Sequence, residues 1–457
     1  MTPAHRIGAL LAADLGWHDP PWDRLTVHQS PTGLATTLPI ADMAAAAQSL
    51  VGLAAAHLHR LRGGPEQTVE VDRWAASLSM TSAAYLTVDD ETAVSWDPLT
   101  GYHRAADGWV YTHCQFAHLR DRLLDAFGLA NDPEAVRARF AGLSRFEIEK
   151  TAQVAGACGI AQRSRAEWQA HPQRAVLAQG PVVALTRVGD AAAGPFEAGE
   201  APLSGVRVLD LSRVIAGPTI GKTLGEHGAD VMRISGPHLP SFDSLVIDTG
   251  VNKRAAFADL RESDGRAALA NLIREADVLI DAYRPGALAG KGFGAEALRE
   301  LNPALVHVRL SAFGPDGPWG GRRGYDTYVQ AATGLTDGDD EPGRLPCQPL
   351  DYLGGYLGAV AAMVALARRL TEGGGWEADL SLARNAMWVW EQADLLGPES
   401  APPSNNPTHA AAVHLLEEMN TAFGRVRAMR PARDLSVTPP TWRTPPVPLG
   451  THPPAWT

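Results

Sequence analysis

The chain has 457 residues, a formal net charge of −11 and 45% hydrophobic residues. This length allows two to four domains, and the acidic balance argues against nucleic acid or an anionic membrane as the main partner, since both bind basic surfaces. The three cysteines match no metal-ligand spacing, so we expect no metal site and a reducing, cytoplasmic location. The apolar run 354–367 is shorter than the roughly 20 residues of a membrane span, so we expect no membrane partner.

The first long predicted helix covers 40–61, IADMAAAAQSLVGLAAAHLHRL, and is followed by a Gly-containing turn and the acidic stretch TVEVDRWAASL. The segment 349–370, PLDYLGGYLGAVAAMVALARRL, repeats this order and precedes WEADLSLARNAM. Asp42 to Arg60 and Asp351 to Arg369 are both 18 positions apart. Chance similarity of two Ala-rich helices is the alternative, but the shared order predicts a partial internal duplication within residues 1–200.

Residues of about 70–190 predict a small α+β unit, because DGWVYTHC is typical of a strand and the stretch around SRFEIEKTAQVAGACGIAQ is helical. The Pro/Gly/Ala-rich segment 192–205 is the predicted linker. The C-terminal residues, 391–457, end in TPPTWRTPPVPLGTHPPAW, and we expect an extended tail there because proline excludes helices and central strands.

From residue 203 to about 390 strands alternate with helices. VRVLDLS, VMRIS, ADVLIDAY and LVHVRLSAF are short apolar runs, separated by helical stretches such as DGRAALANLIREA. This alternation predicts an α/β fold with a Rossmann-like open parallel sheet, covered on both faces. The first turn carries RVIAGP in place of the G-x-G-x-x-G fingerprint, so the sheet does not imply a nicotinamide cofactor.

Five motifs occur in one order: LSGVRVLDLSRVIAGP, NKRAAFADLR, YRPGAL, GRRGYDTYVQAATGL and LDYLGGYLGAV. In this order and spacing the chain resembles the family III CoA-transferases, which also include acyl-CoA racemases. The resemblance implies a Rossmann-like large domain, a smaller α+β domain and an interlocked homodimer. The small-domain-like part precedes the Rossmann-like half here, whereas family members have the reverse order, so the chain resembles a rearranged or trimmed tandem copy.

The resemblance places the nucleophile at Asp351, which opens the long apolar helix. Such an aspartate attacks an acyl-CoA thioester and then carries CoA as an aspartyl thioester, dividing a difficult transfer into easier steps. The helix N-terminus is expected to keep this carboxylate ionised. The alternative is that Asp351 only caps the helix, since aspartate is a favoured N-cap residue. Asp42, which no Rossmann-like half precedes, is interpreted as a cap or a relic.

The resemblance also implies a set of CoA contacts, with cations and backbone groups holding the phosphates. Tyr325 stands where family racemases tend to have histidine, and tyrosine is a poor base at neutral pH. The implied CoA-binding residues are Ile215, Ala216, Ala258, Asp259, Leu260, Arg261, Ala282, Tyr283, Arg284, Lys291, Arg323 and Tyr325.

The expected function is therefore transfer of CoA from an acyl-CoA to a free carboxylic acid, with acyl-CoA as a substrate and no tightly bound cofactor. An acyl-CoA racemase or isomerase is the first alternative, because it shares the fold and the CoA site. A noncatalytic CoA-binding relative is the second, prompted by the rearranged order of the halves.

Overall fold

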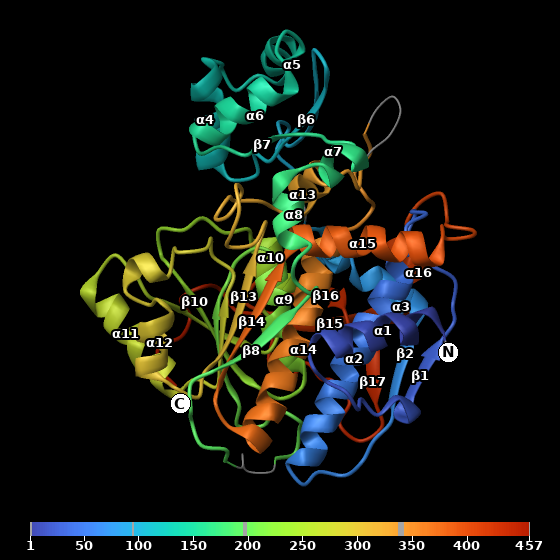
Figure 1. Cartoon of the computed structure of the whole chain (residues 1–457), viewed down its shortest axis with the longest axis vertical. Helices are drawn as coiled ribbons and strands as arrows, with labels where there is room; N and C mark the ends of the chain where they lie inside the picture. Colours follow the sequence, from blue (N-terminus) through green and yellow to red (C-terminus); the bar gives the residue numbers. More distant parts are fainter. Residues whose placement is uncertain (1, 94–95, 195–198, 337–341, 457) are drawn as a thin grey trace.

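A computed structural model describes residues 2–93, 96–194, 199–336 and 342–456. A seven-stranded sheet forms its centre (Figure 1). Six neighbouring strands are parallel and the last, β8, is antiparallel to β14. The chain is thus a mixed α/β protein with a largely parallel sheet, as predicted. In spatial order the strands are β11 (Lys253–Phe257), β10 (Asp230–Ser235), β9 (Arg207–Leu211), β12 (Val278–Asp281), β13 (Val306–Ser311), β14 (Gly375–Ser381) and β8 (Ala184–Val188).

The six parallel strands have the doubly wound order 3-2-1-4-5-6 when they are counted from β9. In this topology the strand order reverses between β9 and β12, and ligands bind beyond the carboxyl ends of the strands at that point. The turns that follow β9 and β12 therefore face the expected binding crevice. The helices between and after these strands are α9 (Ala216–Glu226), α10 (Asp243–Asp248), α11 (Ser263–Glu275), α12 (Ala295–Leu301), α13 (Asp326–Ala332), α14 (Pro349–Glu372) and α15 (Leu382–Leu396).

Helix α14 packs against α9 through glycines. A Cβ atom added at Gly355 would lie 2.5 Å from Cβ of Thr219, and one added at Gly358 would lie 2.6 Å from Cδ1 of Ile220. The two backbones can approach this closely only because the side chains are absent. By length and composition α14 could cross a membrane, but its apolar window is completely buried inside the protein. The packing positions the first turn of α14 beside the turn after β9.

The small domain stands at one end of the molecule (Figure 1). Its own apolar core includes Leu123, Phe140 and Ile148. The predicted limits of about 70–190 are wider than this domain. At the N-terminal side β2 (Val69–Asp72) belongs to a separate sheet with β1 (Leu25–His28), and at the C-terminal side β8 joins the large sheet by pairing with β14. Its elements are β5 (Gly101–Ala105), β6 (Gly108–Thr112), β7 (Gly159–Ala161), α4 (Ala117–Phe127), α5 (Pro133–Ala141) and α6 (Arg145–Val154), and α7 (Arg165–Gln169) and α8 (Pro172–Leu177) lead back to the large domain. The predicted linker, 192–205, lies partly outside the described residues.

The repeated sequence order corresponds to a repeated topology. Parallel strands β1 and β2 flank α2 as β13 and β14 flank α14, and each second strand is followed by a helix, α3 or α15. An antiparallel strand completes each set: β17 pairs with β2, and β8 pairs with β14. Helices α2 and α14 pack against each other. The N-terminal elements are α1 (Pro3–Asp14), β1 (Leu25–His28), α2 (Ile40–Leu61), β2 (Val69–Asp72) and α3 (Arg73–Ser79).

The segment 391–457 differs from the predicted extended tail. It carries α16 (His409–Ala412) and the strands β15 (Leu416–Thr421), β16 (Gly424–Met429) and β17 (Arg433–Leu435), and β16 pairs with β3 (Thr87–Val88), which in turn pairs with β4 (Glu91–Thr92). These strands precede the proline-rich residues, so their N–H groups are available for pairing. After β17 the chain runs over the surface, with an isolated bridge between His452 and Ala256.

Candidate active site

Asp351 lies in the first turn of α14 and is buried, with 6% of its surface exposed. Its side chain does not cap the helix, because the N-cap is Gln348 and makes no side-chain capping bond. The exposed amides of this end are held by another carboxylate: the N–H groups of Leu350 and Asp351 donate to Oδ2 of Asp326, at 2.7 and 2.9 Å. Asp326 is the first residue of α13. The capping alternative for Asp351 is therefore wrong.

The electrostatics of this pair overturn the expectation that the helix end keeps Asp351 ionised. Burial, and then the neighbouring Asp326, raise the pKa of Asp351 well above its usual value. Burial also raises the pKa of Asp326, to about 7, although the two backbone amides and Gln330 donate to it. The N-terminal end of the helix dipole, which favours negative charge, stabilises the carboxylate of Asp326. Asp326 therefore ionises first, and Asp351 keeps its proton to higher pH.

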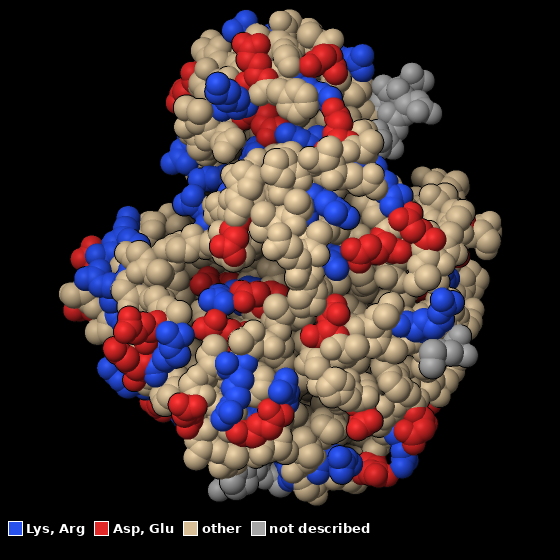
Figure 2. Space-filling model, in the orientation of Figure 1, with Lys and Arg blue, Asp and Glu red and all other residues tan. Residues whose placement is uncertain are grey.

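One side of Asp351 opens into a cavity of about 420 Å³, which we call the arginine-lined cavity. It lies at the carboxyl ends of β9, β12 and β13, where the strand order reverses. Five arginines and one histidine line it, and Asp351 is the only carboxylate among its described lining residues. Figure 2 shows basic side chains gathered where the small domain meets the large one. The basic residues lining the cavity are His118, Arg122, Arg213, Arg284, Arg322 and Arg323.

These cations come from four segments of the chain. Arg122 lies on α4 of the small domain, whereas Arg213 and Arg284 follow β9 and β12 of the large sheet. Arg322 is already engaged, since it donates to Glu149 at 2.8 Å and to the Tyr328 hydroxyl at 2.9 Å. A guanidinium fork matches phosphate oxygens, so the cavity suits a polyphosphate such as the nucleotide part of CoA.

The other side of Asp351 opens into a second cavity, of about 660 Å³. Lysine and arginine are absent from its described lining residues, so we call it the cation-free cavity. Val214, Ile215, Tyr325 and Asp351 line both cavities. Val214 has φ = 73°, a left-handed conformation that is a true outlier for a β-branched residue and is typical of functional turns. The carboxyl of Asp351 thus lies at the junction of a cationic cavity and one whose described lining residues include no lysine or arginine.

The structure brings most of the predicted site residues together. Ile215, Ala216, Ala282, Tyr283, Arg284, Arg323, Tyr325 and Asp351 all line the arginine-lined cavity. Ala258, Asp259, Leu260, Arg261 and Lys291 do not line it. The Arg261 guanidinium is paired with Asp259 at 2.6 Å, on an exposed turn after β11. Their contact with CoA stays a prediction.

Sequence reasoning missed Phe116, His118, Arg122, Arg213 and Arg322. A signal existed for Arg213, because it stands inside the quoted motif DLSRVIAGP, just after a parallel strand at the edge where ligands bind. Its guanidinium lies 5.0 Å from the Phe116 ring centre. The small-domain residues carry no local signal, since only the tertiary fold brings α4 to the large sheet.

Tyr325 is stacked on His113, with ring centres 3.9 Å apart. Burial raises the pKa of Tyr325 and lowers the pKa of His113 to about 3. The tyrosine therefore keeps its proton and the histidine stays neutral near pH 7, and neither matches the pKa of an efficient general base there.

Asp42, the sequence equivalent of Asp351, has a different environment. Its carboxylate accepts from Nε and Nη2 of Arg73, at 3.0 and 2.9 Å, and Arg73 also contacts Glu399. It makes no capping bond, since the N-cap of α2 is Pro39 without a side-chain acceptor. The interpretation of Asp42 as a cap is therefore wrong, and its carboxylate is held in a buried ion pair.

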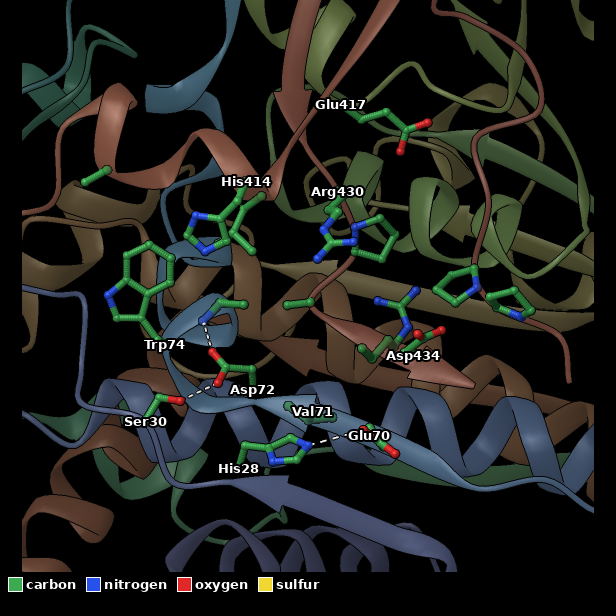
Figure 3. A pocket seen from close by; sticks show the side chains of 18 residues that line it. His28, Ser30, Glu70, Val71, Asp72, Trp74, His414, Glu417, Arg430 and Asp434 are labelled. Atoms are coloured by element: carbon green, nitrogen blue, oxygen red, sulfur yellow. Dashed lines mark hydrogen bonds and ion pairs between the residues drawn. The ribbon is translucent and has the colours of Figure 1, made fainter. Parts of the chain in front are cut away.

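A further cavity, of about 720 Å³, lies at the carboxyl ends of β1 and β2 (Figure 3). The carboxylate of Asp72 points to Ser30 and caps α3 through the N–H of Ala75. Glu70 contacts His28 at 3.2 Å. Asp42 is not among the lining residues. Asp42, Glu70 and Asp72 are thus each held by a neighbouring group, whereas Asp351 opens to two cavities.

A family model described as CoA-transferase family III matches residues 22–194 and 203–414, which is most of the chain. The chain belongs to CoA-transferase family III. The acetyl-coenzyme A transferase nodX of Hypoxylon pulicicidum is 34% identical over 198 residues, covering 41% of this chain and 33% of the relative. The succinate–glutarate CoA-transferase of Agrobacterium fabrum is 33% identical over 203 residues, covering 40% and 51%.

The solved structure of a hypothetical protein from Mycobacterium tuberculosis is 32% identical, with a TM-score of 0.40, and covers 43% of this chain and 57% of its own. The chain spans between 28% and 51% of the length of the curated relatives that it matches. The membership agrees with the resemblance read from the five motifs.

Proposed function

We propose that this chain transfers CoA from an acyl-CoA to a free carboxylic acid, with Asp351 as the nucleophile that carries CoA between them. The observation that supports this most directly is the junction at Asp351. A cavity rich in arginine holds the phosphates on one side, and a cation-free cavity accepts the acyl group on the other. The thioester, which joins the two parts of the substrate, then lies at the carboxyl.

The proposed reaction begins when a carboxylate oxygen of Asp351 bonds to the acyl carbon and the C–S bond breaks, releasing CoA thiolate. The thiolate attacks the carbonyl carbon of Asp351, and the acyl group leaves as a free acid. An acceptor carboxylate then attacks the carbonyl carbon of the aspartyl-CoA thioester, whose C–S bond breaks, so that a second anhydride forms and CoA thiolate is released. The thiolate attacks the carbonyl carbon of the acceptor, which forms the new acyl-CoA and frees the Asp351 carboxylate. The N-terminal end of α9 adjoins the wall between the cavities, because its N-cap residue Ile215 lines both of them, and this end favours the negative charge that develops there.

The nucleophile is the ionised carboxylate, and the pKa of Asp351 is raised. Asp351 must therefore lose its proton to solvent before it attacks. Activity is expected to rise with pH through the pKa of this carboxyl.

The test is incubation with a panel of acyl-CoA donors, followed by hydroxylamine trapping and peptide mass spectrometry. The expected result is an acyl or CoA adduct on the peptide that contains Asp351, which hydroxylamine converts to an Asp351 hydroxamate as CoA or the acid leaves. This product should be absent in Asp351→Asn and present in Asp42→Asn. Absence of any trapped product across the panel, in protein that still binds CoA, would contradict transfer through Asp351 and leave the racemase and the noncatalytic relative as interpretations.

The racemase alternative needs a base that exchanges the α-proton. Tyr325 and His113, the pair beside Asp351, have pKa values displaced away from neutrality in opposite directions. We therefore favour transfer over racemisation. Deuterium incorporation at the α-carbon, measured without an acid acceptor, would reverse this preference.

The resemblance also leads us to propose a homodimer and a cytoplasmic location. One chain already supplies both walls of the arginine-lined cavity, because Arg122 comes from the small domain and Arg284 from the large sheet. The site geometry described above is therefore compatible with either state. Light scattering at micromolar concentration tests the dimer, which a monomeric mass would contradict.

A further inference from the structure

The cation-free cavity has a charge pattern that selects among acyl groups. Its described lining residues include Asp243, Asp326 and Asp351 but no lysine or arginine. His113 is its only histidine, and burial lowers the pKa of this ring to about 3, so it adds no positive charge near pH 7. Every ionisable side chain among its described lining residues is therefore neutral or negative. Arg344, whose guanidinium lies 5.1 Å from the Trp96 ring centre, is not among these residues.

The walls away from Asp351 are apolar or weakly polar. Leu86, Val214, Phe242 and Leu245 supply apolar contacts, and Trp96 adds an aromatic ring near the exposed side. A volume of about 660 Å³ falls within the range of pockets that enclose drug-sized ligands. A short acyl group would leave much of this space to water.

We infer that the acyl groups taken by this site are bulky and apolar and carry no second carboxylate, so that donor and acceptor are monocarboxylic acids or their CoA esters. This inference rests on the proposed function and names the substrate class of the same site. A second carboxylate of a dicarboxylic substrate would lose its hydration in the cavity, find no cation among the described lining residues and face Asp326. A branched alkyl or aromatic group would gain contacts with the apolar wall.

The experiment compares donors that differ in charge at nearly constant shape. Succinyl-CoA and 4-methylpentanoyl-CoA are matched, because an isopropyl group replaces the carboxylate, and 4-phenylbutyryl-CoA adds bulk. Each donor is incubated with its own radiolabelled acid, so that exchange needs no separate acceptor. We expect kcat/KM for succinyl-CoA to be at least about 100-fold below that for 4-methylpentanoyl-CoA, and 4-phenylbutyryl-CoA to be used as well as 4-methylpentanoyl-CoA or better.

The outcomes separate the two proposals. Equal or better use of succinyl-CoA, with an adduct on Asp351, would overturn the substrate class and leave CoA transfer intact. Absence of exchange and of an Asp351 adduct with all three donors would overturn the proposed function and this inference with it.

Substitutions at Ala84 test the cavity directly, because this residue lines it and is exposed, so that a larger side chain can be accommodated. Ala84→Arg adds a cation and is expected to raise the ratio of succinyl-CoA to 4-methylpentanoyl-CoA use at least about 10-fold. Ala84→Trp reduces the space and is expected to lower use of 4-phenylbutyryl-CoA most. The matched control is Val154→Arg, at a position on α6 that is 82% exposed and lines neither cavity. An unchanged ratio in folded Ala84→Arg would contradict the assignment of this cavity to the acyl group.

Discussion

Replacing Asp351 by asparagine is expected to abolish transfer while making the fold more stable. The fold favours the protonated carboxyl, because burial and Asp326 raise its pKa well above 3.8. Asparagine resembles that protonated form in shape and is neutral at every pH. The helix end loses no cap, since Asp326 holds the amides of Leu350 and Asp351.

The magnitude follows from proton linkage. Below the unfolded pKa, near 3.8, Asp351 is protonated in both states and the variant has no electrostatic advantage. As pH rises, the unfolded chain releases this proton first, so the wild type loses stability relative to the variant by up to about 1.4 kcal/mol per pH unit. This growth ends when pH passes the folded pKa, above which the difference is constant.

The assay is urea unfolding of both proteins at pH 4, 5, 6 and 7, paired with turnover measurements. Transfer should fall by about 10⁴-fold or more, as when other covalent catalysts lose their nucleophile. Asp42→Asn is the matched control and should have the opposite sign. It breaks the buried pair with Arg73, at a cost of up to about 3 kcal/mol because Glu399 still compensates the guanidinium, and it should keep its turnover.

A variant that unfolds more easily at pH 7 and retains normal turnover would refute the reasoning. That result would show that Asp351 stabilises the helix end and performs no chemistry. A stability difference that does not change between pH 4 and pH 7 would refute the raised pKa alone.

Four further variants, with two controls, test other parts of the site and the sheet beneath it. Asp326→Asn keeps an acceptor for the two helix amides but removes the charge beside Asp351. The acidic limb of the plot of kcat/KM against pH should therefore move to lower pH. An unmoved limb would show that the two carboxyls do not interact. Arg213→Ala and Arg323→Ala should each raise KM for acyl-CoA roughly 10-fold or more, which corresponds to the loss of one hydrogen bond to a charged group. The control is Arg425→Ala, which removes an ion pair with the exposed Asp90 and should leave KM unchanged. Lys253→Met removes the cation that lies 2.7 Å from the buried carboxylate of Asp210, and it should lower the free energy of unfolding in urea by about 3–5 kcal/mol. The control, Arg254→Met, affects the more exposed pair with Asp230 and should lower it by under about 1 kcal/mol. Similar losses for the two variants would contradict the argument from burial.

Local patterns in the sequence determined the secondary structure of the large domain and pointed to Asp351 as its proposed nucleophile. The apolar run in VRVLDLS became β9, and the helical stretch GAEALRELN became α12, because the periodicity of a short segment depends on its own residues. The motif order indicated the family, and the repeated positions of Asp42 and Asp351 indicated the duplicated topology.

The tertiary structure alone decided the chemistry of the two aspartates. Asp326 lies 25 positions before Asp351 and takes the helix amides, whereas Arg73 lies 31 positions after Asp42 and neutralises it. The same applies to the arginine-lined cavity, where Arg122 of α4 and Arg213 after β9 meet only in the fold. Coulomb and desolvation energies depend on distance and burial in space, and neither quantity is encoded by spacing along the chain. The sequence could therefore identify the carboxylates, but only the packing around them determined which one is paired, which one caps a helix and which one opens to substrate.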